Sequence, residues 1–83
     1  MGERRLQTVY HNGMGLFVSQ EVLDKMGLSN HQTINETQMW QVIGLSAAQF
    51  VGNMERRQNS GEKGIPDTSE LRERLDRLGF TIK

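Results

Sequence analysis

The chain has 83 residues, ten basic and ten acidic side chains, no cysteine, and 35% hydrophobic residues. This length predicts one small domain, residues 1–83, with a thin core. The lack of cysteine excludes disulfide bonds and thiolate zinc sites. The balanced charge lacks the basic excess that favours nucleic-acid binding, and no apolar run approaches the ~18 residues of a membrane span, so we expect a cytoplasmic protein.

Residues 6–18 predict a β-hairpin. Asn12 and Gly13 are the residue types that best tolerate the positive φ angles of a two-residue type I′ turn. Strand-forming residues lie on both sides of this pair, with Thr8 to Tyr10 before it and Leu16 to Val18 after it.

Four short helices are expected after the hairpin, over residues 20–26, 36–43, 47–57 and 68–78. Each follows a side chain that can cap a helix, and three end at a glycine followed by an apolar residue. The caps are Ser19, Asn35, Ser46 and Asp67, and the glycines are Gly27, Gly44 and Gly79. In the last helix, Leu71, Leu75 and Leu78 form an apolar stripe that we expect to be buried. The predicted fold is α+β, mainly α.

The sequence contains no pattern of an active site. His11 and His31 are the only histidines, and neither has an acidic residue at a spacing that suggests a metal site or a base with its orienting group. The serines fall at caps or in loops, and no glycine-rich phosphate loop follows a strand. We expect a protein that is not an enzyme and uses no metal, cofactor or small-molecule substrate.

Residues 36–54, ETQMWQVIGLSAAQFVGNM, resemble the helix-turn-helix of Cro and repressor-like DNA-binding proteins. Gly44 matches the turn, Leu45 follows it, and Phe50 and Met54 match inward-facing positions. Residues 62–79 resemble the closing loop and helix of that family. The resemblance implies a small transcriptional regulator of phage or mobile-element type that binds DNA as a homodimer, with residues 46–57 as the recognition helix.

The same resemblance implies which residues contact DNA. Ser46 and Gln49 would hydrogen-bond to base edges, and Ala47 or Ala48 would contact a thymine methyl group. Basic side chains that follow would hold phosphates; these are Arg56, Arg57 and Lys63.

Residues 9–28, VYHNGMGLFVSQEVLDKMGL, resemble a second group, the AbrB and MazE swapped-hairpin DNA-binding regulators and antitoxins. The positions that match in order are Asn12, Gly15, Leu16, Val18, Glu21, Leu23, Gly27 and Leu28. This resemblance also implies a DNA-binding regulator.

The alternative function is a small inhibitor or adaptor that binds a larger protein without binding DNA. The neutral charge favours it, and so does the apolar outward face of the predicted helix 47–57, formed by Ala47, Ala48 and Val51. The thin core and the exposed strand of the hairpin favour a homodimer in either case. Sequence alone leaves both functions open.

Overall fold

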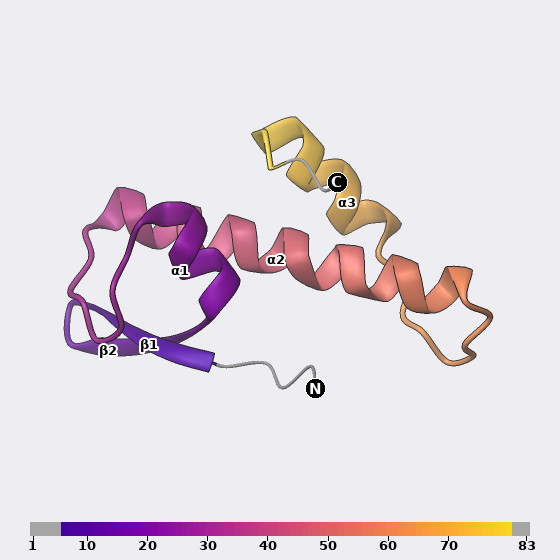
Figure 1. The fold of residues 1–83 in the computed structure, drawn as a ribbon. Helices are drawn as coiled ribbons and strands as arrows, with labels where there is room; N and C mark the ends of the chain where they lie inside the picture. The colour runs from indigo at the N-terminus through magenta and orange to yellow at the C-terminus, as the bar shows by residue number, and fades with distance from the viewer. Residues whose placement is uncertain (1–5, 81–83) are drawn as a thin grey trace. The chain divides into compact units, whose positions relative to one another are not determined.

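The computed structural model describes residues 6–80 (Figure 1). The elements in chain order are β1 (Leu6–His11), β2 (Met14–Ser19), α1 (Gln20–Met26), α2 (Glu36–Asn59) and α3 (Ser69–Leu78). The fold is α+β and mostly helical, with an N-terminal antiparallel hairpin, as predicted. It has three helices in the described residues, whereas the sequence predicts four. The chain divides into two compact units, one ending at Ser46 and one beginning at Ala47.

The hairpin is closed by the predicted turn. Asn12 and Gly13 have φ angles of 50° and 77°, as a type I′ turn requires. His11 pairs with Met14 directly beside this turn. Because side chains alternate along a strand, the register places the pair of Val9 and Leu16 on the face that packs into the core.

Helix α1 begins and ends as predicted. The Ser19 hydroxyl accepts a hydrogen bond of 3.3 Å from the backbone N–H of Val22. Gly27 has a φ of 68°, and the N–H of Leu28 donates to the carbonyl of Leu23 at 3.0 Å. These bonds satisfy backbone groups that helix ends leave unpaired.

The segment after α1 covers the outer edge of β1, a feature that its polar sequence does not predict. Tyr10 donates its N–H to the carbonyl of Gln32 at 2.9 Å and accepts from the N–H of Ile34 at 2.7 Å. The carbonyl of Thr8 accepts a further bond, at 2.6 Å, from the N–H of His31. The hairpin therefore has a third, strand-like neighbour beside β1 but none of this kind beside β2 in the described residues.

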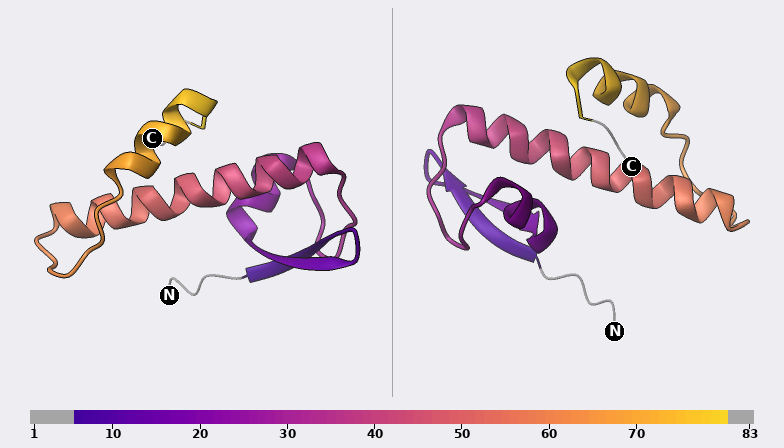
Figure 2. Two further views of the ribbon diagram at one scale, coloured as in Figure 1. Left: turned by 180° about the vertical axis from the view of Figure 1, so that it is seen from behind. Right: turned by 45° about the horizontal axis from the view of Figure 1, so that its top comes forward.

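The core of the first unit forms where both strands, α1 and the beginning of α2 meet. Figures 1 and 2 show α1 and the first turns of α2 on the same side of the hairpin. The residues buried there are Val9, Val18, Val22, Leu23, Leu28, Ile34 and Val42. All of them are β-branched residues or leucine, which pack with few voids and little loss of rotamer freedom.

The two helices predicted over residues 36–43 and 47–57 are one continuous helix, α2, so that part of the prediction is wrong. Helix α2 begins at the predicted capping box, where Asn35 Oδ1 accepts from the N–H of Gln38 at 2.8 Å and Gln38 Oε1 accepts from the N–H of Asn35 at 3.0 Å. It then continues through Gly44 and Ser46 to Asn59. Glycine inside a helix costs only about 1 kcal/mol relative to alanine, so packing overrides the stop signal. Of the helices in residues 6–80, none is both long and apolar enough to cross a membrane.

In the second unit, α3 packs against the later turns of α2 through a small core. Leu75 is buried beside Ala48 and Val51, and Leu71 is partly buried there. The predicted burial of Leu78 is wrong, because its exposed fraction is 66%. The chain turns back directly after α3, so a later apolar residue, Phe80, reaches this core instead.

The start of α3 also differs slightly from the prediction. The residue before the helix is Thr68, which makes no side-chain capping bond. The predicted cap, Asp67, lies one position earlier and accepts bonds from both the N–H (3.0 Å) and the hydroxyl (2.7 Å) of Ser69. These two bonds lower the pKa of Asp67, because they stabilise the charged carboxylate.

Candidate interaction surface

The residues predicted to read DNA bases lie in the middle of α2 and not at the start of a separate helix. Ser46 is inside the helix, and its buried hydroxyl oxygen has no hydrogen-bond partner within the described residues. Ala48 is buried, Ala47 is partly buried, and Gln49 is half-buried. A recognition helix needs an exposed N-terminal turn that can enter the major groove, and an uninterrupted α2 does not provide one here.

The alternative protein-binding face is also not on the surface. Val51 is fully buried and Ala48 nearly so, both against Leu75 of α3. These small apolar residues suit close packing between two helices of the same chain. The predicted face of Ala47, Ala48 and Val51 is therefore part of the core of the second unit.

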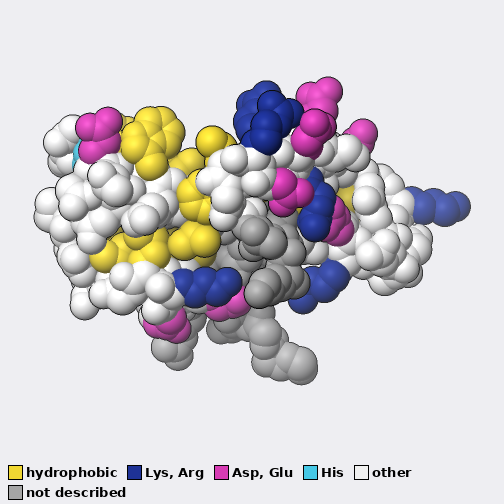
Figure 3. Space-filling model, turned by 90° about the horizontal axis from the view of Figure 1, so that it is seen from above, with side chains coloured by type: hydrophobic (Ala, Val, Ile, Leu, Met, Phe, Trp, Pro, Cys, Tyr) yellow, Lys and Arg dark blue, Asp and Glu magenta, His cyan; other side chains and the backbone are white. Residues whose placement is uncertain are grey.

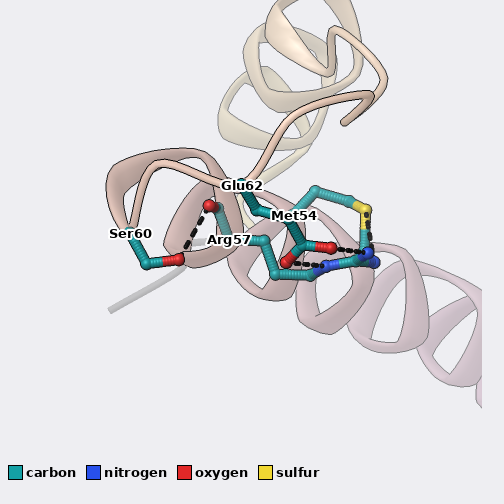
Figure 4. A network of polar contacts seen from close by, with 4 residues as sticks. All are labelled: Met54, Arg57, Ser60 and Glu62. Carbon is teal, nitrogen blue, oxygen red and sulfur yellow. Dashed lines mark hydrogen bonds and ion pairs between the residues drawn. The ribbon is translucent and has the colours of Figure 1, made fainter.

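Arg57, one of the predicted phosphate contacts, takes part in an exposed network at the end of α2 (Figure 4). Its Nε donates to Glu62 at 2.9 Å, and its Nη2 also pairs with that carboxylate. Its Nη1 lies 3.8 Å from the sulfur of Met54, and its backbone carbonyl accepts a 2.9 Å bond from the Ser60 hydroxyl. The bidentate pair raises the pKa of Arg57 and lowers the pKa of Glu62, in both cases mainly through the side-chain hydrogen bond.

Other arginines of the second unit also face carboxylates. Arg72 contacts Glu55 at 2.7 Å, and Arg77 contacts Glu73 at 3.1 Å. Figure 3 shows basic and acidic side chains interleaved on the face seen from above. Of the other two predicted phosphate contacts, Arg56 donates to the Asn53 side chain and Lys63 is exposed. Opposite charges interleaved in this way weaken the local potential that a basic patch would direct at phosphates.

The first unit exposes large apolar side chains on the first turns of α2. Trp40 has an exposed fraction of 59%, and Ile43 is exposed three residues later. Met39 and Val42, next to them in sequence, turn inward and pack into the core. Because residues three apart share a helix face, Trp40 and Ile43 form one exposed apolar face, which we call the α2 face. Figure 3 shows hydrophobic side chains on the surface of the end of the molecule where α2 begins.

A second exposed apolar surface lies on the hairpin. Phe17 has an exposed fraction of 78%, the largest of the exposed apolar side chains in residues 6–80. It points away from the core, on the same side of the sheet as Leu6 and Tyr10, because these positions alternate with the buried Val9 and Val18. Tyr10 is only partly exposed, and its ring stacks with His31 at a centroid distance of 6.1 Å.

The two histidines stand apart from any cluster of acidic groups. His11 lies in β1 opposite Met14, and His31 stacks on Tyr10. Within residues 6–80, no group of three or more histidine, aspartate or glutamate side chains is placed to hold a metal ion.

Comparison with known proteins identifies no relative of this chain. No protein-family model, curated protein or solved structure matches the chain. The functional inference therefore rests on the residues of this chain alone. The exposed apolar side chains are the feature that was not predicted from the sequence. Their signal was present in the sequence, because Trp40 and Ile43 fall on a face of α2 adjacent to the one that Met39 and Val42 occupy once residues 36–43 are read as helix.

Proposed function

We propose that this chain is a small protein-binding regulator, an inhibitor or adaptor, that contacts a larger protein through the α2 face. The observation that carries the proposal is the exposure of Trp40 on a helix whose opposite face is well packed. Tryptophan, with tyrosine and arginine, is enriched among the residues that dominate binding energy at protein interfaces. A monomer gains nothing from presenting its single tryptophan to water.

The size of the α2 face indicates how much binding it supports. An exposed fraction of 59% for Trp40 corresponds to about 150 Å² that a partner would bury. At ~25 cal/mol per Å², this is an upper bound of about 4 kcal/mol. Glu36 is exposed one turn before Trp40, so the partner best suited to this face has an apolar pocket with a basic residue at its rim.

The test compares two variants, each with one exposed apolar residue replaced by alanine. Trp40→Ala and Leu78→Ala each remove an exposed apolar side chain from a helix, so both should fold. We expect the tagged parent chain to retain one stoichiometric protein from a nuclease-treated extract of its host. Trp40→Ala should weaken this complex by about 30-fold or more, the effect of losing a hot spot worth at least ~2 kcal/mol.

Leu78→Ala is the matched control and should bind as the parent chain does. If Trp40→Ala and Ile43→Asp both bind the partner with the affinity of the parent, the α2 face is not the contact. If recovery depends on nucleic acid and disappears with nuclease, the protein-binding proposal fails as a whole.

A DNA-binding regulator is the second candidate, and one observation favours it. The hairpin and α1, with left-handed Gly27 after it, occupy the same stretch of sequence that resembles the AbrB and MazE group. In this case the exposed basic residues Arg56 and Lys63 hold phosphates, and Arg56→Ala should weaken binding to all sequences and flatten its salt dependence. Fluorescence anisotropy with genomic DNA fragments from about 50 to 200 mM salt tests this. Absence of salt-dependent binding by the folded parent chain would exclude it.

A further inference from the structure

Within residues 6–80, the edge of β2 that faces away from β1 is unpaired at Gly15 and Phe17, and its geometry follows from the bonds of β1. Residues of an antiparallel pair point their backbone groups alternately toward and away from each other. Thr8 and Tyr10 direct theirs away from β2, because they bond to residues 30–34. Their partners in the register, Phe17 and Gly15, must therefore direct their N–H and C=O groups away from β1. No backbone hydrogen bond between elements of residues 6–80 reaches these groups.

This edge lacks the features that prevent pairing with another chain. Proteins protect edge strands with charged side chains, proline, bulges or a covering segment. Residues 14–19 read MGLFVS and contain no charge and no proline, and the register of β1 with β2 has no bulge. The opposite edge of the hairpin, in contrast, is covered by the chain itself.

We propose that β2 pairs antiparallel with β2 of a second copy of this chain, with Leu16 opposite Leu16 of the second copy. In this register Gly15 lies opposite Phe17 of the second copy, and the reverse pair is equivalent by symmetry. Every outward backbone group of Gly15 and Phe17 is then bonded, because these residues form the hydrogen-bonded pairs. Each hairpin keeps its own β1, so no element is exchanged. This pairing does not involve the α2 face, and it stands or falls independently of the proposed function.

The side chains on the outer side of the sheet are complementary in this register. Phe17 extends from one copy, and Gly15 of the other copy has no side chain to obstruct it. Beside Gly15 stands the ring of Tyr10, whose Cε1 lies 3.6 Å from the position that a glycine Cβ would occupy. The phenyl ring therefore fits over the glycine and against the tyrosine edge, an arrangement in which aromatic side chains stabilise glycine in sheets.

The area is sufficient for a reversible dimer. Phe17 and Tyr10 on the outer side of the sheet and Met14 on the other side have exposed fractions of 78%, 37% and 67%, so at most roughly 350–400 Å² of their apolar side chain per copy can be covered. With the strand backbone, the total for two copies is close to the ~1,000 Å² at which specific interfaces begin. We therefore expect dissociation in the micromolar range.

The first test changes Gly15 and Phe17 one at a time, because the proposed register places each opposite the other. A Cβ at Gly15 would meet no atom closer than 3.5 Å in its own chain, and threonine favours strands. Gly15→Thr should leave the monomer at least as stable while weakening the dimer at least tenfold, as should Phe17→Thr. Sedimentation from about 1 to 500 µM measures this, and Leu78→Ala is the control that should dimerise as the parent does. A parent chain that is monomeric throughout, or a Gly15→Thr chain that dimerises equally well, overturns the proposal.

The second test fixes the register and uses the absence of cysteine in this sequence. Leu16→Cys would bring two thiols together at a non-hydrogen-bonded pair with a Cα separation of about 4.5 Å, within disulfide range. Met14→Cys would place its two thiols four residues apart along the strands, at about 14 Å. Under mild oxidation Leu16→Cys should become a covalent dimer much faster than Met14→Cys, after circular dichroism has shown both to be folded. Equal rates, or faster linkage of Phe17→Cys, would overturn the register.

Discussion

The contrast between Leu75 and Leu78 gives the sharpest test of the second unit. Both lie on α3, and their spacing predicts that both are buried. Their exposed fractions are 4% and 66%. Leu75→Ala removes a buried side chain, so it should destabilise the protein by about 2–5 kcal/mol through lost transfer energy and a residual cavity.

The expected loss for Leu75 lies toward the lower end of that range. Among the described residues, only Ala48 and Val51 share the buried core of this unit with Leu75, and a small core can partly collapse around the gap. Leu78→Ala removes a side chain that is about one-third covered, so it should cost less than about 1 kcal/mol. The change of leucine to alanine in a helix is the same in both variants, which cancels the propensity term.

Urea denaturation followed by helical circular dichroism measures both variants against the parent. The midpoint should fall clearly for Leu75→Ala and little for Leu78→Ala. Equal losses for the two variants would refute the placement of α3 against the later turns of α2 within this unit. A larger loss for Leu78 than for Leu75 would show that α3 is rotated about its axis.

Two further predictions concern the ends of α2. Asn35→Ala removes the capping bond to the N–H of Gln38 and should destabilise the protein by about 1 kcal/mol in the same denaturation assay; a variant as stable as the parent would show that the helix does not begin there. At the other end, the Arg57 pair lowers the pKa of Glu62, so this contact contributes above the ordinary pKa of glutamate, about 4.3, and is lost as pH falls through the lowered folded value. The backbone amide of Glu62 should therefore shift in an NMR titration from about pH 6 to about pH 2 with a midpoint below that of an unpaired glutamate; Arg57→Gln should return the midpoint to the ordinary value, and an unchanged midpoint would contradict the pair.

Local signals in the sequence predict the first unit well. Asn12-Gly13 leaves few alternatives to a type I′ turn, and Ser19 and Gly27 mark both ends of α1. The capping box of Asn35 and Gln38 likewise marks the start of α2. In each of these cases one or two residues form the hydrogen bonds that define the element, so the information is local.

Tertiary contacts decide the features that the sequence does not predict. Gly44 and Ser46 look like a helix stop followed by a new cap, yet α2 passes through both because the cost of one glycine is small beside the packing on either side. Residues 30–33 are polar and only Ile34 after them is apolar, so nothing short of β1 itself shows that the backbone of this segment completes the edge of the sheet. Ala48 and Val51 form an apolar surface in isolation, and only α3 shows that this surface is covered.

The most direct test of the proposed function follows the single tryptophan. Incorporation of 5-fluorotryptophan gives one ¹⁹F signal that reports on Trp40 alone, even in a mixture of unlabelled proteins. In the isolated chain this signal should show the H₂O/D₂O shift of an exposed ring. In nuclease-treated host extract it should move or broaden and lose that solvent shift, while genomic DNA fragments leave it unchanged. A ring already shielded in the isolated chain, or a signal that responds to DNA and not to the extract, would contradict the assignment of the α2 face as a protein-binding surface.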